Sequence, residues 1–170
     1  MCRLVVSAKR TARGKSRPGL KAEVLSGVRR LERGLRLAAR EAERATGLSA
    51  AQLFMLEKLA EGPATSIADL SARTLTDRSS VSVVVDRLAA AGLVKRSPSS
   101  EDRRRSETQI TARGREILAR APLSPTSTLM RALARTPAGK VAQLASALSA
   151  LNKELGYTEA PMLFEEATES

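Results

Sequence analysis

The chain has 170 residues, and 29 Lys and Arg against 18 Asp and Glu give it a formal net charge of +11. Such a charge attracts polyanions, most often nucleic acid or an anionic membrane. One cysteine and no histidine exclude an internal disulfide, a nucleophile–histidine catalytic site and a histidine-bound metal. We therefore predict that the protein is not an enzyme and uses neither a cofactor nor a metal.

The apolar content of 42 % is enough for a globular core, but only 2 % of the residues are aromatic. The core must then consist of Leu, Val and Ala, a composition that favours helices. No apolar stretch approaches the roughly 18 residues that a membrane-spanning helix needs, and no apolar segment resembles a signal peptide. These features predict a cytoplasmic protein without a membrane partner.

Both ends of the chain have a biased charge. Residues 1–19 contain six basic residues and no acid, which predicts a disordered basic arm; an artefact of the start site, without a role, is an equal alternative. Cys2 lies in this arm, where nothing lowers its pKa, so a redox-sensing role is not expected. Residues 157–170 contain acids and no basic residue, which predicts a loose acidic tail.

Helical spacing of apolar residues predicts a long amphipathic helix from Leu20 to Ala45, ended by Gly47. A second helix begins at Ser49, because residues 49–52 have the spacing of a capping box, and it stops in residues 61–64.

The next segment predicts two short helices joined by a tight break. Ser66 begins the first helix with the same capping-box spacing, and residues 74–76 form the break. Asp77 caps a second helix that Gly92 closes. Three consecutive valines at residues 83–85 also suit a strand, but the cap and the residues after the valines favour a helix.

A short hairpin follows, with strands over residues 93–97 and 106–110 and a loop over 98–105. Thr111 caps the next helix, which Pro122 and Pro125 interrupt. A short helix is predicted from about Thr126 to Arg135. The last helix begins at residues 136–137, with proline at its first position, and ends at Gly156.

A short helix, a tight turn and a second helix form the outline of a helix-turn-helix, whose second helix lies in the major groove. Arginine donates two hydrogen bonds to guanine, serine bonds to bases or phosphates, and an exposed valine suits a thymine methyl group. We expect Arg87 to pair with a phosphate or an acid. The candidate DNA-binding residues of this helix are Arg78, Ser79, Ser80, Ser82, Val83 and Arg87.

The hairpin would lie beside the neighbouring minor groove, which is narrow and negative and which arginine side chains enter. Its loop contains Arg103, Arg104 and Arg105, the remaining candidate DNA-binding residues. Asp102 is expected to pair with a nearby arginine and stabilise the loop. The alternative for such a run of charge is a solvated loop without a partner.

These segments resemble the winged helix-turn-helix of the MarR-type transcriptional regulators. The family pattern is D-x-S-x-V-S, a leucine, G-L-[VI]-x-R, D-x-R and L-T-x-x-G, found here at residues 77–82, Leu88, 92–96, 102–104 and 110–114. The chain departs from the family at Val83, where arginine is frequent, at residues 74–76, which lack the usual glycine, and in the polar Glu107 and Gln109 of the return strand.

The resemblance implies an α+β, mostly α fold: a winged helix-turn-helix over residues 49–120, with flanking helices over residues 20–48 and 121–156 that form a homodimerisation domain. It implies double-stranded DNA as partner, a palindromic operator, repression, and release by a small apolar or phenolic effector. The ligand-binding residues are unknown; the effector crevice of the family would be lined here by Leu, Ala, Phe54 or Met55. The alternatives are a non-specific basic nucleic-acid-binding protein and a protein-interaction adaptor.

Overall fold

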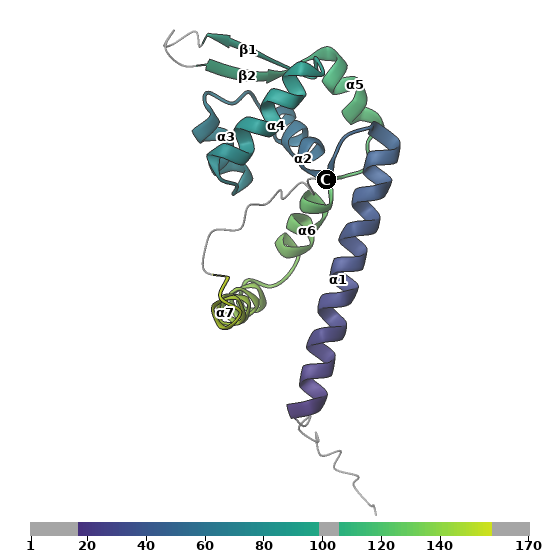
Figure 1. The fold of residues 1–170 in the computed structure, drawn as a ribbon, viewed down its shortest axis with the longest axis vertical. Helices are drawn as coiled ribbons and strands as arrows, with labels where there is room; N and C mark the ends of the chain where they lie inside the picture. The colour runs from purple at the N-terminus through teal and green to yellow at the C-terminus, as the bar shows by residue number, and fades with distance from the viewer. Residues whose placement is uncertain (1–16, 99–105, 158–170) are drawn as a thin grey trace, which may run out of the picture. The chain divides into compact units, whose positions relative to one another are not determined.

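The computed structural model of the chain describes residues 17–98 and 106–157. The chain falls into two compact units, residues 1–34 and 35–170, and each is described by itself. The second unit contains the predicted helix-turn-helix and hairpin, together with the helices that follow them (Figure 1).

Helix α1, Arg17–Thr46, begins earlier than the sequence predicts. The arm predicted to be disordered over residues 1–19 is therefore wrong for residues 17–19, while residues 1–16 lie outside the described part of the chain. Pro18 does not interrupt the helix, because the first helical turn leaves its N–H groups without intrahelical partners. The helix ends as predicted at Gly47, whose φ of 71° only glycine adopts readily.

Helix α2, Ala50–Glu61, begins with the predicted capping box. The Ser49 N–H donates to Oε1 of Gln52 at 2.9 Å, and the Gln52 N–H donates to Oγ of Ser49 at 3.3 Å. Helix α3, Ile67–Thr74, has only half of such a box. Ser66 accepts from the Asp69 N–H, but the Asp69 carboxylate accepts from the N–H of Thr65 instead of Ser66.

Helix α4, Arg78–Ala90, confirms the helical prediction for the triple valine. It is followed by the antiparallel hairpin of β1, Val94–Pro98, and β2, Ser106–Ile110, in a register that pairs Val94 with Ile110 (Figure 1). The sequence did not predict a further bridge on the other side of β2. Ala64, in the loop between α2 and α3, exchanges two backbone hydrogen bonds of 2.8 and 2.9 Å with Thr108. This bridge attaches the hairpin to the helix-turn-helix.

Helix α5, Ala112–Arg120, is capped by Thr111 as predicted. The Thr111 hydroxyl accepts from the Gly114 N–H at 3.1 Å and donates to the carbonyl oxygens of Gly92 and Leu93. The two motif segments that flank the hairpin are thereby joined at its base.

Two predicted helix starts need correction. Helix α6, Pro125–Ala134, includes Pro125 as its first residue, with Ser124 as cap, so Pro125 starts this helix and does not break one. Helix α7, Ala138–Glu154, begins after Pro137, which occupies the cap position and not the first helical position. The hydroxyl of Thr136 donates back to the carbonyl of Ala132 and caps nothing in α7.

The core of the second unit lies where α2, α4, the hairpin and the end of α1 meet. Leu and Val dominate it, as the composition predicts. Its largest fully buried apolar side chains are Phe54, Leu53, Met55, Leu56, Leu59, Leu70, Leu88, Leu93, Val81 and Val85.

Candidate nucleic-acid interface

The turn between α3 and α4 contains no glycine, and Leu75 takes the left-handed conformation with φ 55° and ψ 38°. Its side chain is 75 % exposed. Ser71 and Thr76 close the turn: the Thr76 N–H donates to the Ser71 carbonyl at 3.2 Å, and the Ser71 hydroxyl donates to the Thr76 carbonyl. The turn therefore forms without the glycine that is usual in the family. Leu75 takes its place in a backbone conformation that is unfavourable for a residue with a Cβ.

Asp77 caps α4 and draws the first serines of the helix into local bonds. Its Oδ1 accepts from the Ser79 hydroxyl at 2.5 Å and from the Ser80 N–H at 2.8 Å. These bonds, the Ser79 hydroxyl first, lower the pKa of Asp77 from 3.8 to about 2, so the carboxylate is charged at neutral pH. Ser79 therefore offers its hydroxyl oxygen as an acceptor, while its proton is held by Asp77.

The two faces of α4 differ sharply in burial. Val81, Val84, Val85 and Leu88 are buried. On the opposite face Arg78, Ser79 and Arg87 are exposed, Ser80 and Ser82 are half-buried, and Val83 is 49 % exposed. The candidate residues of this helix thus share the face that the core does not use.

An ion pair that the sequence did not predict joins α4 to the hairpin. Nη1 of Arg96 lies 2.8 Å from Oδ1 of Asp86, with both side chains partly exposed. An exposed pair of this kind adds about 0–1 kcal/mol to stability. The pair also directs the Arg96 side chain of β1 toward the exposed face of α4. The candidate wing residues Asp102, Arg103, Arg104 and Arg105 lie outside the described residues.

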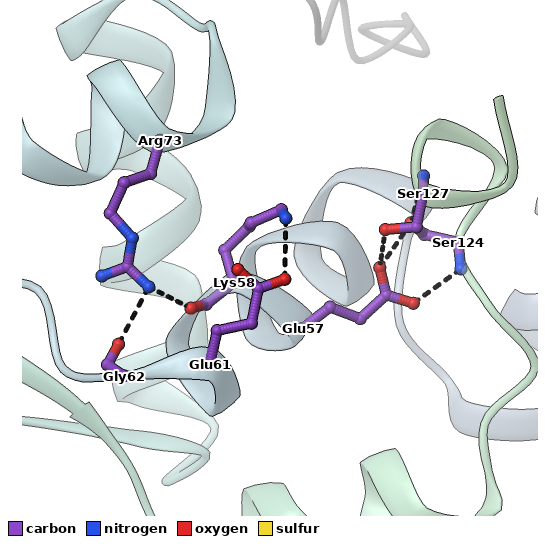
Figure 2. Close-up of polar contacts among 7 residues, drawn as sticks. All are labelled: Glu57, Lys58, Glu61, Gly62, Arg73, Ser124 and Ser127. Carbon is purple, nitrogen blue, oxygen red and sulfur yellow. Dashed lines mark hydrogen bonds and ion pairs between the residues drawn. The ribbon is translucent and has the colours of Figure 1, made fainter. Parts of the chain in front are cut away.

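Arg73 of α3 was also missed by sequence analysis, although it holds the helix-turn-helix against α2. Its guanidinium donates to the carbonyl oxygens of Lys58 and, at 3.0 Å, of Gly62 (Figure 2). It also donates to the carbonyl oxygen of Pro63 at 3.1 Å. The Lys58 carbonyl lies in the last turn of α2, where a helix leaves its acceptors unpaired, and Gly62 and Pro63 follow the helix directly. A planar fork of donors matches this cluster, as a lysine ammonium would not.

The described residues contain no group of three or more His, Cys, Asp or Glu side chains that could hold a metal ion. Within the same ranges, no helix is long and apolar enough to cross a membrane. A shallow groove on α1 is lined by that helix alone, and another is lined by α7 and Tyr157. Phe54 and Met55, expected to line an effector crevice, are fully buried, so as described neither faces an open crevice.

Comparison with known proteins identifies this arrangement. Residues 28–105, which include α2, α3, α4 and β1, match the sequence model of the MarR family. Over these residues the chain is similar to the MarR family. Among curated proteins, no sequence matches the chain.

Solved MarR-like structures share the fold over most of their length. The transcriptional regulator BldR from Sulfolobus solfataricus is 25 % identical, with a TM-score of 0.52 over 84 % of this chain and 99 % of that one. A probable transcriptional regulator from Pseudomonas aeruginosa is 25 % identical, with a TM-score of 0.51 over 78 % and 98 %. CouR from Rhodococcus jostii RHA1, bound to p-coumaroyl-CoA, is 23 % identical, with a TM-score of 0.55 over 78 % and 93 %. The chain has the winged helix-turn-helix fold of MarR-family transcriptional regulators.

Proposed function

We propose that the protein is a homodimeric repressor that binds a palindromic operator in double-stranded DNA and is released by a small apolar or phenolic ligand. The observation that carries this proposal is the outer face of α4, where Arg78, Ser79, Ser82 and Val83 remain accessible on a helix anchored by buried valines. In a helix-turn-helix this face meets base edges in the major groove.

The local bonds of Asp77 support specific roles for this face. Because Asp77 engages the Ser79 proton, we infer that Ser79 accepts from a base amino group instead of donating to a phosphate. Arg78 begins the helix beside it and is the candidate for a bidentate contact to guanine. The three arginines of the wing, Arg103, Arg104 and Arg105, are proposed to enter the adjacent minor groove, with Asp102 stabilising the loop.

Two apolar stripes support a homodimer. In α1, Leu20, Val24, Val28 and Leu31 recur at helical spacing and are all about half exposed. The same pattern occurs in α7 and its C-cap residue, at Leu144, Leu148, Leu151 and Leu155. Exposed apolar stripes of this length mark interaction surfaces, and two-fold pairing would cover them in both copies.

The effector is proposed by analogy. CouR, which shares the fold, is bound to p-coumaroyl-CoA, and an aromatic acid or its thioester is accordingly the first class of ligand to test. We infer that the ligand acts by changing the separation of the two α4 helices, since spacing determines whether both enter successive major grooves.

Footprinting on the DNA upstream of the protein's own gene tests the proposal. We expect protection of two half-sites whose centres lie about 10–10.5 bp, or a multiple, apart, with loss of protection when p-coumarate or p-coumaroyl-CoA is added. Equal competition by random duplex would instead favour non-specific binding through the net charge of +11. Failure to bind any duplex would favour the protein-interaction adaptor.

A further inference from the structure

The carboxylate of Glu57, in the middle of α2, binds the first turn of α6 (Figure 2). Its Oε1 accepts from the Ser124 N–H at 2.7 Å, and its Oε2 accepts from the Ser124 hydroxyl at 2.6 Å. Oε2 also accepts from the Ser127 hydroxyl. The donors are 67 and 70 residues away from Glu57 in the chain, so these bonds are tertiary contacts between distant segments.

Ser124 is completely buried, and its N–H and hydroxyl both donate to Glu57. Its hydroxyl donates to Glu57 while accepting from the Ser127 N–H at 3.1 Å, the bond that caps α6. Hydrogen bonds to a charged acceptor are stronger than neutral ones. A negative charge at a helix N-terminus is also favoured by the helix dipole. The carboxylate therefore stabilises both the start of α6 and its attachment to α2.

The geometry of the Glu57–Ser124 junction restricts the rotation of α6 against α2 as well as the distance between the two helices. A single hydrogen bond would allow α6 to pivot on α2, but here both carboxylate oxygens bind, and they bind backbone and side-chain donors of one residue. The next residue of α2, Lys58, accepts through its carbonyl from Arg73 of α3. Adjacent residues of α2 thus attach the helix-turn-helix on one side and the C-terminal helices on the other, as Figure 2 shows.

We propose that Glu57 is a positioning residue that determines the half-site spacing the protein recognises. This inference rests on the proposed function, in which α1 and α7 pair two copies. The orientation of α4 in each copy then depends on the path from α7 through α6, the Glu57–Ser124 junction and α2 to α3. A loosened junction leaves each α4 able to bind its half-site but allows the two helices to adopt several separations.

The test measures binding to palindromic duplexes whose half-site separation is changed one base pair at a time. Glu57→Gln and Ser127→Ala are compared with wild type, because each weakens the junction without removing the buried cap of α6. Glu61→Gln is the matched control on α2, since it breaks only the exposed pair with Lys58. Ser127→Thr retains the hydroxyl and should restore wild-type behaviour. Sedimentation and thermal unfolding show whether each variant remains a folded dimer.

Wild type, Glu61→Gln and Ser127→Thr should share one sharp optimum of separation. Glu57→Gln and Ser127→Ala should lose about tenfold in affinity at that optimum and much less at neighbouring separations, which flattens the profile. A uniform loss at every separation, or an unchanged profile, would overturn the inference. A wild-type protein without any optimum would contradict the proposed function itself, so the two failures are distinguishable.

Discussion

A Cβ atom placed on Gly114 would lie 2.4 Å from the carbonyl oxygen of Leu93 and 2.8 Å from Cγ1 of Ile110. The Leu93 carbonyl cannot move away, because it accepts from the Thr111 N–H and the Thr111 hydroxyl at the base of the hairpin. The glycine of the L-T-x-x-G pattern is thus explained by a close approach of α5 to the backbone before β1.

Replacing Gly114 by alanine should therefore destabilise the protein despite the better helix propensity of alanine. We expect the free energy of unfolding to fall by about 1–3 kcal/mol, as for other overpacked sites. Gly139→Ala is the matched control, because a Cβ there meets nothing within 4 Å, and it should raise stability slightly. Urea denaturation of both variants measures the difference. An equal change in the free energy of unfolding of the two variants would contradict the close approach of Gly114 to the Leu93 carbonyl.

Leu75 should be replaceable by glycine with a gain in stability. The left-handed conformation costs a residue with a Cβ roughly 1–2 kcal/mol, and Leu75 is exposed and contributes little to the core. Allowing for the greater chain entropy of glycine, we expect Leu75→Gly to add about 1 kcal/mol. Leu123→Gly, at another exposed leucine without positive φ, should destabilise. A loss of stability in Leu75→Gly would show that the leucine has a packing role.

The Asp77 cap should make stability depend on pH in acid. Its pKa is lowered to about 2 in the folded protein from 3.8, so the charged carboxylate stabilises the fold above about pH 4 and this contribution is lost as the pH falls through 2. Asp77→Asn should be less stable than wild type at pH 7, and the two should converge between pH 4 and 2. Denaturation curves across that range test this, and a constant difference would exclude the charge as the cause.

Arg73 should not tolerate lysine. One ammonium cannot reach the three carbonyls of residues 58, 62 and 63 in the geometry of a guanidinium fork. We expect Arg73→Lys to lower the free energy of unfolding by about 1–3 kcal/mol, because partly buried acceptors lose their donors. Arg135→Lys, at an exposed arginine at the end of α6, should change nothing. Thermal unfolding of both proteins gives the comparison.

Substitutions should distinguish residues that contact bases from residues that contact phosphates. Arg78→Ala should reduce discrimination at one base-pair position by about 1–3 kcal/mol. Arg104→Ala should weaken binding to every sequence and reduce the slope of log affinity against log salt by about one. Fluorescence anisotropy over a set of single-substitution operators, at several salt concentrations, measures both. If Arg78→Ala instead lost the same affinity for every operator, that arginine would contact the DNA backbone and not a base.

Helix caps were predictable from the sequence because their partners lie within three residues. Ser49, Asp77 and Thr111 all cap as expected, and helical spacing correctly separated the buried and exposed faces of α4. Pro125 misled the prediction, since the same residue that ends one helix is well suited to begin another. Its role depends on Ser124, and the burial of Ser124 depends on a residue far away in the chain.

The contacts that assemble the site were not predictable, because they join distant segments through ordinary residue types. Glu57 and Arg73 look like solvated charges on amphipathic helices, and Ala64 looks like part of a loop. Only the fold brings Glu57 to Ser124 and Ala64 to Thr108. The outward position of the α4 residues was predicted and found, whereas their contact with DNA, and the roles of residues 102–105, stay predictions.

The bridge between Ala64 and Thr108 also bears on self-association through sheet edges. Within the described residues, β2 has a second backbone partner at Thr108, whereas the outer edge of β1 has none. That strand exposes Lys95 and Arg96 and ends in Pro98, which has no N–H to donate. Charge and proline at an edge discourage a foreign strand from adding to it. These features should disfavour aggregation through this edge of the hairpin.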